Sequence, residues 1–401
     1  MTSSVSSTNH FEFLVIGGGT AGITVASRIL NQVSDSSLAV IEPSDTHYYQ
    51  PLWTLVGAGV VDKEETARPM ASVIPKGATW IQDYASELLP DENAVLTRDG
   101  RRFTYDYLVV APGIQMNWDK VPGLKESIGK NGVCSNFAYQ YADKTWEFLK
   151  NFKEGNAIFT FPATETKCGG APQKIMWLAE HYFRQHHLRD KANVIFATAK
   201  SGIFGIPYYA ETLKQLAKER GIKTRLRNNL VEIRPYAKMA VFENLETGER
   251  EAIPYEMIHV TPPQSAPDFI RQSSLVDEEG WVDVDPYTLQ HKTYSNVFSL
   301  GDVSNLPTSK TGAAIRKQAP VLVKNLLALR DGLPLTEKYN GYSSCPLITG
   351  YGRLILAEFD YDSQPQETFP FDQRKERYSM YLLKRYVLPF LYWYGMLKGR
   401  A

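Results

Sequence analysis

Cysteine is scarce in this chain, with three residues in 401 and no two of them close together. Cys134, Cys168 and Cys345 are too few and too far apart for a dense disulfide scaffold, and their spacing fits no CxxC metal or redox motif. Any pairing among them has to be made by the fold. The sequence predicts no metal site.

Net charge and long apolar runs are also missing. Forty-four basic residues balance 44 acidic ones, which excludes the overall positive field that recruits nucleic acid. No run of about 18 uninterrupted apolar residues exists, so a membrane-spanning helix is not expected. The segment Met1–His10 has no apolar stretch and no arginine, and we expect neither a signal peptide nor a transit peptide there.

A glycine turn near the start of the chain follows a short apolar run and precedes a helical pattern. Phe11–Ile16 predicts a strand and Ile23–Leu30 a helix, with a GxGxxG turn between them. A second apolar run ends in Glu42, about 20 residues beyond the turn, as in a βαβ unit. Such glycines let the backbone approach a pyrophosphate at a helix N-terminus, and the acid suits the ribose hydroxyls of an adenosine. A tight turn without a ligand is the alternative. The residues predicted to bind a dinucleotide are Gly17, Gly19, Gly22 and Glu42.

The rest of the chain alternates strand-like and helix-like segments, which favours a parallel-sheet α/β architecture. We expect a first dinucleotide-binding-type domain at 10–120, a second Rossmann-like domain at 121–265, and a return to the first at 295–335. Residues 336–401 stand apart as a C-terminal region. The proline-rich stretch Thr261–Pro267 is the expected crossover. The further predicted strands and helices are Tyr107–Val110, Ala157–Phe161, Val194–Ala197, Met257–Val260 and Val297–Leu300, and Lys174–His187, Tyr208–Arg220 and Gly312–Arg330.

Two later segments point to FAD as the dinucleotide. Tyr107–Gly113 and Thr293–Asp302 both resemble signatures of the glutathione-reductase-like flavoproteins. In that family a Gly-Asp pair ends the second segment, and its aspartate approaches the ribityl and phosphate part of FAD. The resemblance assigns this role to Asp302, with Gly113 and Gly301 beside the cofactor. The alternative is a strand that ends in an ordinary turn, where Gly and Asp are common.

The second domain lacks the fingerprint of a nicotinamide nucleotide. Its first predicted strand leads into Pro162–Gly170, where Cys168 stands in place of phosphate-binding glycines, and Lys174 opens the following helix. The electron donor is therefore not expected to be NADH. The region after Glu42 also lacks the closely spaced cysteine pair of the disulfide reductases, which excludes their mechanism.

Sulfur chemistry then depends on the remaining cysteines. Cys168 precedes a helix start and lies near Lys167 and Lys174, a setting that lowers the pKa of a thiol and makes it a nucleophile. Cys345 is expected in a turn-like segment. For each, the alternative is a buried small hydrophobic residue.

Five stretches of the chain closely resemble the sulfide:quinone oxidoreductase family, specifically its type II, mitochondrial-like branch. The likeness spans nearly the whole chain, and the stretches are too idiosyncratic for generic flavoprotein constraint. The stretches that carry it are His47–Trp53, Lys167–Lys174, Leu306–Thr311, Cys345–Tyr351 and Glu367–Gln373.

The resemblance implies that Cys168 and Cys345 meet as a redox pair beside the isoalloxazine of FAD, with or without an extra bridging sulfur. Hydrogen sulfide would attack Cys345 and leave it as a persulfide, and the released Cys168 thiolate would donate to the flavin. A membrane quinone, ubiquinone or menaquinone, would reoxidise it. Lys174 and Lys310 are candidates for electrostatic support, against the alternative of solvated surface lysines. The resemblance further implies FAD contacts by Thr20, Ala21, Gln50, Lys310 and Thr311. Cys134 is expected to be structural or accessory.

The C-terminal stretch 375–398 is rich in aromatic residues and interrupted by basic ones. Lys384, Arg385 and Pro389 divide it, so we expect a pair of amphipathic interfacial helices with basic residues at the lipid margin, near a quinone channel. A helix packed on the protein core is the alternative. The expected protein is a peripheral membrane protein on the cytoplasmic face of a bacterial plasma membrane, or a trimmed mitochondrial inner-membrane protein. A small sulfur acceptor, such as sulfite or a thiol, is a further expected partner.

Two other functions remain open from the sequence. A type II NADH:quinone oxidoreductase shares the fold, FAD and membrane attachment, but needs the second nucleotide fingerprint. A flavin-bound persulfide carrier or sensor would pass its redox state to a partner protein instead of a quinone.

Overall fold

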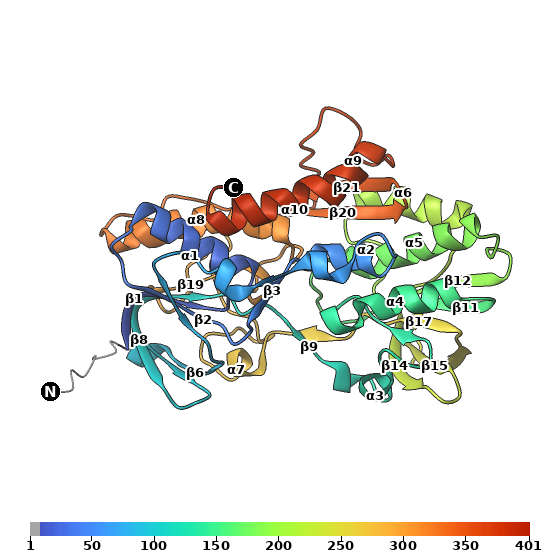
Figure 1. Ribbon diagram of the computed structural model, residues 1–401, viewed down its shortest axis with the longest axis horizontal. Coiled ribbons are helices and arrows are strands. Elements are labelled where there is room, and N and C mark those ends of the chain that lie inside the picture. The colour runs from blue at the N-terminus through green and yellow to red at the C-terminus, as the bar shows by residue number, and fades with distance from the viewer. Residues whose placement is uncertain (1–8) are drawn as a thin grey trace.

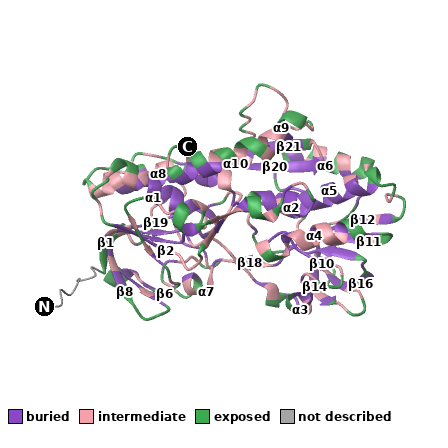
Figure 2. Cartoon of the chain, viewed as in Figure 1, coloured by how far each residue is buried: buried purple, intermediate pink, exposed green. Residues whose placement is uncertain are grey.

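The computed structural model describes residues 9–401 and has a mixed α/β fold built on two Rossmann-like sheets (Figure 1). The prediction that Met1–His10 carries no targeting segment falls outside the described residues, apart from its last two. Figure 2 shows that the strands of both sheets are largely buried, while exposed residues lie along the outer helices and loops.

The first sheet has seven strands and carries the N-terminal glycine turn. Its central strands run in parallel in the order β5-β2-β1-β8, and β19 joins β8 from far along the chain. The helices α1 (Thr20–Gln32) and α8 (Gly312–Arg330) pack together beside it. Its strands are β1 (His10–Ile16), β2 (Leu38–Ile41), β5 (Ala78–Ile81), β6 (Ala85–Leu89), β7 (Ala94–Thr97), β8 (Arg102–Val110) and β19 (Val297–Ser299).

The second sheet has five parallel strands in the order β10-β17-β11-β12-β13. The helix α5 (Ala171–Gln185) follows β11 and packs against it, as a βαβ crossover requires. A three-stranded antiparallel sheet, β14-β15-β16, lies next to it. The remaining elements here are β10 (Val133–Cys134), β11 (Gly155–Phe161), β12 (Ala192–Thr198), β13 (Lys223–Arg225), β14 (Asn228–Arg234), β15 (Met239–Asn244), β16 (Arg250–Pro254), β17 (Met257–His259), α3 (Leu124–Ser127), α4 (Tyr139–Asn151) and α6 (Pro207–Glu219).

The chain passes between the two sheets twice, and the two passages pair with each other. β9 (Gln115–Met116) and β18 (Gln264–Ser265) form a short antiparallel ladder. The second of these lies inside the expected crossover Thr261–Pro267. The exact domain boundaries remain a prediction. Smaller elements around the first sheet are β3 (Thr46–Tyr48), β4 (Ala67–Pro69), α2 (Trp53–Val56) and α7 (Asp268–Arg271).

Cys345 lies in a strand, and the expectation of a turn-like segment is wrong. β20 (Ser343–Gly350) and β21 (Arg353–Phe359) form a two-stranded antiparallel sheet in which Cys345 pairs with Ala357. The prolines and serines of this stretch resemble turn residues. In an isolated pair of strands, however, Pro346 can leave its missing N–H on the unpaired side.

The C-terminal stretch forms one continuous helical run instead of the expected pair of helices. It consists of α9 (Tyr378–Leu382), a π-helical turn η7 (Leu383–Val387), α10 (Leu388–Phe390), a second π-helical turn η8 (Leu391–Gly395) and a 3₁₀ turn η9 (Met396–Lys398). Pro389 lies between the two π-helical turns, where the altered hydrogen-bonding pattern accommodates its missing N–H. None of the helices within residues 9–401 is long and apolar enough to cross a membrane. We call residues 378–398 the C-terminal helix.

Candidate active site

The loop that carries Cys168 connects β11 to α5 and is bound to a second loop at 304–310. The Cys168 N–H donates to the Lys310 carbonyl oxygen at 2.7 Å, and the Gly169 N–H donates to Ser309 Oγ at 3.1 Å. Cys168 has a positive φ of 55°, a left-handed conformation that costs a residue with a Cβ about 1 kcal/mol. The two loops thus hold the Cys168 backbone in a strained conformation beside β20.

Cys168 and Cys345 meet although 177 residues separate them in the sequence, with their sulfur atoms 3.9 Å apart. All three cysteines lie in the described part of the chain, and none forms a disulfide. Lys174, on the first turn of α5, places its Nζ 3.1 Å from the Cys168 sulfur and is itself only 4% exposed. The structure therefore brings together three of the four residues predicted to be catalytic.

The two thiols of this pair differ in acidity. Hydrogen bonding from Cys345, followed by the charge and hydrogen bond of Lys174, holds the pKa of Cys168 well below its usual range, although burial opposes the shift. The interaction with Cys168, together with burial, raises the pKa of Cys345 well above its usual range. The arrangement stabilises Cys168 as a thiolate and Cys345 as a thiol that donates to it.

Lys384 of the C-terminal helix joins this site, where the sequence interpretation placed it at a lipid margin. It is 2% exposed, and its Nζ donates to the Pro51 carbonyl oxygen at 3.0 Å. Burial, followed by the charge of Lys174, lowers the pKa of Lys384 to about 7, while the two cysteines oppose the shift. The expectation is wrong for this residue because Lys384 lies one turn after the buried Met380 and Tyr381 and shares their inward helix face.

Replacing Lys384 by methionine should raise the melting temperature at pH 6, because burying an ammonium group is unfavourable. The folded-state pKa of about 7 lies below the value of 10.5 for a free lysine, so the unfolded chain binds more protons between these values. The wild type therefore gains stability as the pH rises above about 7. The difference between variant and wild type should shrink over that range. A constant difference across pH 6 to 9 in scanning calorimetry would contradict a buried, titrating Lys384.

Lys310 contributes to the site differently from its predicted role. Its Nζ donates to the Ser304 carbonyl oxygen at 2.8 Å and lies 4.0 Å from the centre of the Trp281 ring, while its carbonyl oxygen holds Cys168. Burial lowers the pKa of Lys310 to about 8, and Asp302 opposes that shift. Electrostatic support of the thiolate by Lys310 remains a prediction.

Asp302 and Lys167 influence each other electrostatically, and the charge of Cys168 also acts on Asp302. Burial raises the pKa of Asp302 to about 6, against the charges of Lys310 and Lys167. Burial likewise lowers the pKa of Lys167 to about 8, and Asp302 opposes it. The Lys167 Nζ donates to Gln50 Oε1 in η1 (Gln50–Leu52), so two residues predicted to contact FAD lie around this lysine. The sequence analysis named Lys167 only as a neighbour of Cys168.

The glycine turn between β1 and α1 fits a flavin nucleotide. Among residues 9–401, no side chain caps the N-terminus of α1, and its first turn contains no acidic residue. No described atom lies within 4 Å of the position that a Cβ on Gly19 would take. A Cβ on Gly17, by contrast, would lie 2.3 Å from the Ala111 carbonyl oxygen, so Gly17 is required by the packing of the turn. Amide groups and a positive helix end are thus open to a pyrophosphate.

Other predicted FAD residues lie around this turn, and several have partners within the protein. Glu42 accepts from the Gly18 and Ser44 N–H groups at 2.7 and 2.8 Å, and burial raises its pKa. Thr311 caps α8 by accepting from the Ala314 N–H at 3.1 Å. No described atom lies within 4 Å of the position that a Cβ on Gly113 would take, so there is free space beside this glycine. Ala21 is buried and lies against Gly301, which precedes Asp302.

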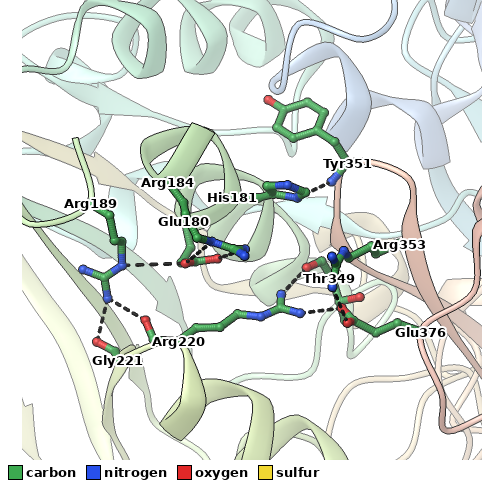
Figure 3. Close-up of polar contacts among 10 residues, drawn as sticks. All are labelled: Glu180, His181, Arg184, Arg189, Arg220, Gly221, Thr349, Tyr351, Arg353 and Glu376. Carbon is green, nitrogen blue, oxygen red and sulfur yellow. Dashed lines mark hydrogen bonds and ion pairs between the residues drawn. The ribbon is translucent and has the colours of Figure 1, made fainter. Parts of the chain in front are cut away.

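A partly buried ionic network lies at the far end of α5, where the C-terminal helix begins (Figure 3). Arg220 donates to Glu376 Oε1 at 2.6 Å and also to the Thr349 carbonyl oxygen, and Arg353 donates to Glu376 Oε2 at 3.1 Å. His181 on α5 accepts from the Tyr351 N–H at 3.0 Å. These contacts hold the β20–β21 turn and Glu376, two residues before α9, against α5 and the C-terminal end of α6.

Comparison with known proteins identifies the family of this chain. A family model described as pyridine nucleotide-disulphide oxidoreductase matches residues 11–147. A mitochondrial sulfide:quinone oxidoreductase of Mus musculus is 52% identical over 392 residues, which cover 98% of this chain and 87% of the relative. The chain belongs to the sulfide:quinone oxidoreductase family. The relative from Dictyostelium discoideum, with the same description, is 50% identical over 98% of this chain and 87% of its own length. The predicted family and enzyme class are thereby confirmed, and the cofactor of the sulfide:quinone oxidoreductase family is a flavin.

Solved structures confirm the predicted fold class. The sulfide:quinone oxidoreductase from Aquifex aeolicus superposes with a TM-score of 0.83 at 21% identity, covering 98% of this chain and 92% of its own. A structure of NDH2 from Plasmodium falciparum with NADH superposes at 0.69 and 9% identity, covering 97% and 96%. At these identities the likeness concerns the fold alone. The two-sheet architecture is therefore shared more widely than the sulfide:quinone oxidoreductase family.

Proposed function

We propose that this protein is an FAD-dependent sulfide:quinone oxidoreductase that oxidises hydrogen sulfide at Cys168 and Cys345 and passes two electrons to a membrane quinone. One observation carries the proposal: two cysteine sulfurs 3.9 Å apart with a buried ammonium group 3.1 Å from one of them. A type II NADH:quinone oxidoreductase, which would transfer electrons from NADH to the flavin and on to a quinone, needs no such cysteine pair. Membership of the family supports it independently.

The difference in acidity between the two thiols determines which cysteine sulfur is attacked by hydrosulfide. In the oxidised state the pair forms a disulfide or carries one bridging sulfur, since 3.9 Å exceeds one S–S bond of about 2.05 Å and is less than two bonds end to end. In the disulfide, hydrosulfide attacks the Sγ atom of Cys345, because Cys168 is the better leaving group as a thiolate paired with Lys174. The S–S bond breaks, Cys345 retains a persulfide, and Cys168 leaves as a thiolate.

The remaining steps return the pair to the disulfide. A sulfur acceptor, or a second hydrosulfide when no other acceptor is present, removes the terminal sulfur of the persulfide, and Cys345 is left as a thiolate. The two thiolates then form the S–S bond again and release two electrons. A bound FAD, with its pyrophosphate at the Gly17–Gly22 turn, would supply the two-electron acceptor between the cysteines and the quinone. Quinone reduction takes up two protons. The protein supplies position and positive charge, through Lys174 and Lys384.

A cleft of about 1710 Å³ leads toward the cysteine pair from the side of α6. It reaches Gly169 and Ser309, and Ser309 Oγ lies 3.6 Å from the Cys345 sulfur. We infer that the sulfur acceptor, sulfite or a small thiol, enters here. We place the quinone on the side of the cysteine pair away from this cleft. There the C-terminal helix packs on Pro51, to which Lys384 donates a hydrogen bond.

The outward face of the C-terminal helix suits a membrane surface. Tyr386, Val387, Phe390 and Tyr394 are 51 to 66% exposed and recur at helical spacing. Aromatic side chains of this kind anchor a helix in the headgroup region, with nearby basic residues attracted to anionic lipid. We propose attachment to one face of a quinone-containing membrane, the mitochondrial inner membrane or the cytoplasmic face of a bacterial plasma membrane.

Replacing Tyr386 and Phe390 together by serine should weaken binding to anionic lipid vesicles about tenfold or more, because two aromatic rings no longer enter the interface. Vesicle co-sedimentation measures the change. The matched control is Tyr236→Ser, since Tyr236 is 98% exposed but lies between β14 and β15. Equal losses in the control and the double variant would refute the assignment of this face.

Steady-state turnover tests the proposed activity. The purified protein should reduce a soluble quinone analogue with sulfide and should not do so with NADH. Addition of sulfite or a small thiol should increase the rate if removal of the persulfide sulfur limits turnover. Turnover with NADH but not with sulfide would refute the proposal, and reduction of the flavin without any turnover of quinone would favour a persulfide carrier.

A further inference from the structure

The C-terminal helix reaches the glycine turn of the predicted FAD site through a buried tyrosine. Tyr392 is 3% exposed, and its hydroxyl lies 2.5 Å from His47 Nε2 and 3.0 Å from Thr20 Oγ1. His47 is equally buried, and its Nδ1 lies 2.9 Å from the Gly18 carbonyl oxygen. A side chain from the end of the protein thus contacts Thr20 directly and reaches Gly18 through His47, so it is linked to both residues that flank Gly19.

Each hydrogen bond in this group has only one possible direction. A carbonyl oxygen can only accept, so His47 Nδ1 carries the hydrogen and donates to Gly18. Burial lowers the pKa of His47 to about 4, so the ring is neutral and its Nε2 is an acceptor. Tyr392 must then donate to His47, which leaves Thr20 to donate to the Tyr392 oxygen. The result is a chain of three hydrogen bonds from Thr20 to Gly18.

These three hydrogen bonds hold the glycine turn from the side that faces the protein interior. The other side of the turn stays open. Gly19 is exposed, and no described atom lies within 4 Å of the position that a Cβ on it would take, so the space for a pyrophosphate stays free. The Thr20 hydroxyl hydrogen is used by Tyr392, so Thr20 can serve an anionic ligand only through its N–H. The positions of Gly18 and Thr20 on either side of Gly19 are therefore set by Tyr392 and His47.

The helix is fixed to the same domain by further contacts beyond Tyr392. Ser27 Oγ donates to the Leu397 carbonyl oxygen at 2.8 Å, and Asn31 donates to that of Lys398 at 2.9 Å. The helix begins at the ionic network of Glu376 (Figure 3) and ends beside α1, so it spans the length between the two sheets (Figure 1). Movement of this helix would displace the turn.

We propose that the C-terminal helix is part of the flavin site, and that Tyr392 and His47 are positioning residues which hold the Gly18–Thr20 turn in its nucleotide-binding conformation. The helix whose outer face meets the membrane thereby determines how firmly the cofactor is bound. The inference rests on FAD as the cofactor, but not on sulfide as the electron donor.

Tyr392→Phe tests the inference, because it removes one hydroxyl and keeps the ring, which lies 4.4 Å from that of Tyr49. Loss of the hydroxyl leaves His47 Nε2 buried without a donor, so the dissociation constant of FAD should rise about tenfold. Reconstitution of the apoprotein with FAD, followed by flavin fluorescence, measures it. Tyr386→Phe, on the exposed face of the same helix, is the matched control and should not change the constant.

A double-mutant cycle separates positioning from a general loss of stability. If Tyr392 and His47 act through the same series of hydrogen bonds, the double variant Tyr392→Phe/His47→Phe should weaken FAD binding little more than either single change. Reciprocity adds a second measurement: FAD should slow trypsin cleavage near Lys398 in the wild type and lose this effect in Tyr392→Phe. An unchanged FAD dissociation constant in Tyr392→Phe, or strictly additive losses, would overturn the inference. A variant that binds FAD weakly while the wild type fails to oxidise sulfide would refute the proposed function and leave this inference standing.

Discussion

Cys345→Ser and Cys168→Ser each lower the rate of flavin reduction by sulfide about 10³-fold or more, because each removes one half of the sulfur pair that forms the covalent intermediate. The reason is geometric. With the sulfurs 3.9 Å apart, no other thiol in the described chain can replace either partner, since Cys134 lies buried in β10. Stopped-flow absorbance of the flavin under anaerobic conditions measures the rate.

Cys134→Ala is the matched control for these variants. Burial raises the pKa of the Cys134 thiol to about 12, so it is neither a thiolate nor accessible to sulfide at neutral pH. The control should keep the wild-type rate within a factor of about two. A Cys345→Ser protein that retains its flavin and still reduces it with sulfide at a rate within about tenfold of the wild type would contradict the covalent mechanism.

Lys174→Met shifts the pH dependence of sulfide oxidation toward alkaline pH. The ammonium group 3.1 Å from Cys168 holds the pKa of that thiol low, so its removal raises the pKa. A thiolate exists above its pKa; the rate of the variant therefore rises at higher pH than that of the wild type. The loss should reach about 10²-fold on the acidic side and diminish as the pH increases.

Lys174→Arg distinguishes charge from packing at this position. It keeps a cation on the first turn of α5 and should leave the midpoint of the pH profile close to that of the wild type. If Lys174→Met lowers the rate by the same factor at every pH, the lysine does not act through the acidity of Cys168. Titration of the thiolate absorbance in the reduced protein provides a readout independent of turnover.

The regular α/β elements could be predicted because their signals are local. Strand β1, the glycine turn and α1 follow directly from the hydrophobic pattern, and α8 has the predicted bounds Gly312–Arg330. The antiparallel pair β20–β21 escaped prediction because its serines and Pro346 resemble a turn. Its strand character depends on pairing with β21, a tertiary interaction that the local sequence does not contain.

The candidate site was predictable only in part. The contact between Cys168 and Cys345 depends on 177 intervening residues, and the sequence suggested it only through resemblance to a family. The sequence could not place Lys384 in the site, because a basic residue in an aromatic helix is equally typical of a lipid-facing anchor. Which face of the helix lies inward depends on how it packs against the rest of the protein, and this packing places Lys384 beside the buried Met380 and Tyr381. The sequence around Tyr392 also did not indicate its role in the flavin site, because its partners His47 and Thr20 lie more than 340 residues away.

The central claim is that sulfide delivers electrons to the flavin through Cys168 and Cys345. Its most direct test is the absorbance of the purified yellow protein on anaerobic mixing with sulfide, without quinone, compared with NADH. The account predicts that sulfide alone produces a long-wavelength charge-transfer band and then bleaches the flavin, and that a quinone analogue restores the oxidised spectrum. Bleaching by NADH, with no response to sulfide, would contradict the account and favour an NADH:quinone oxidoreductase.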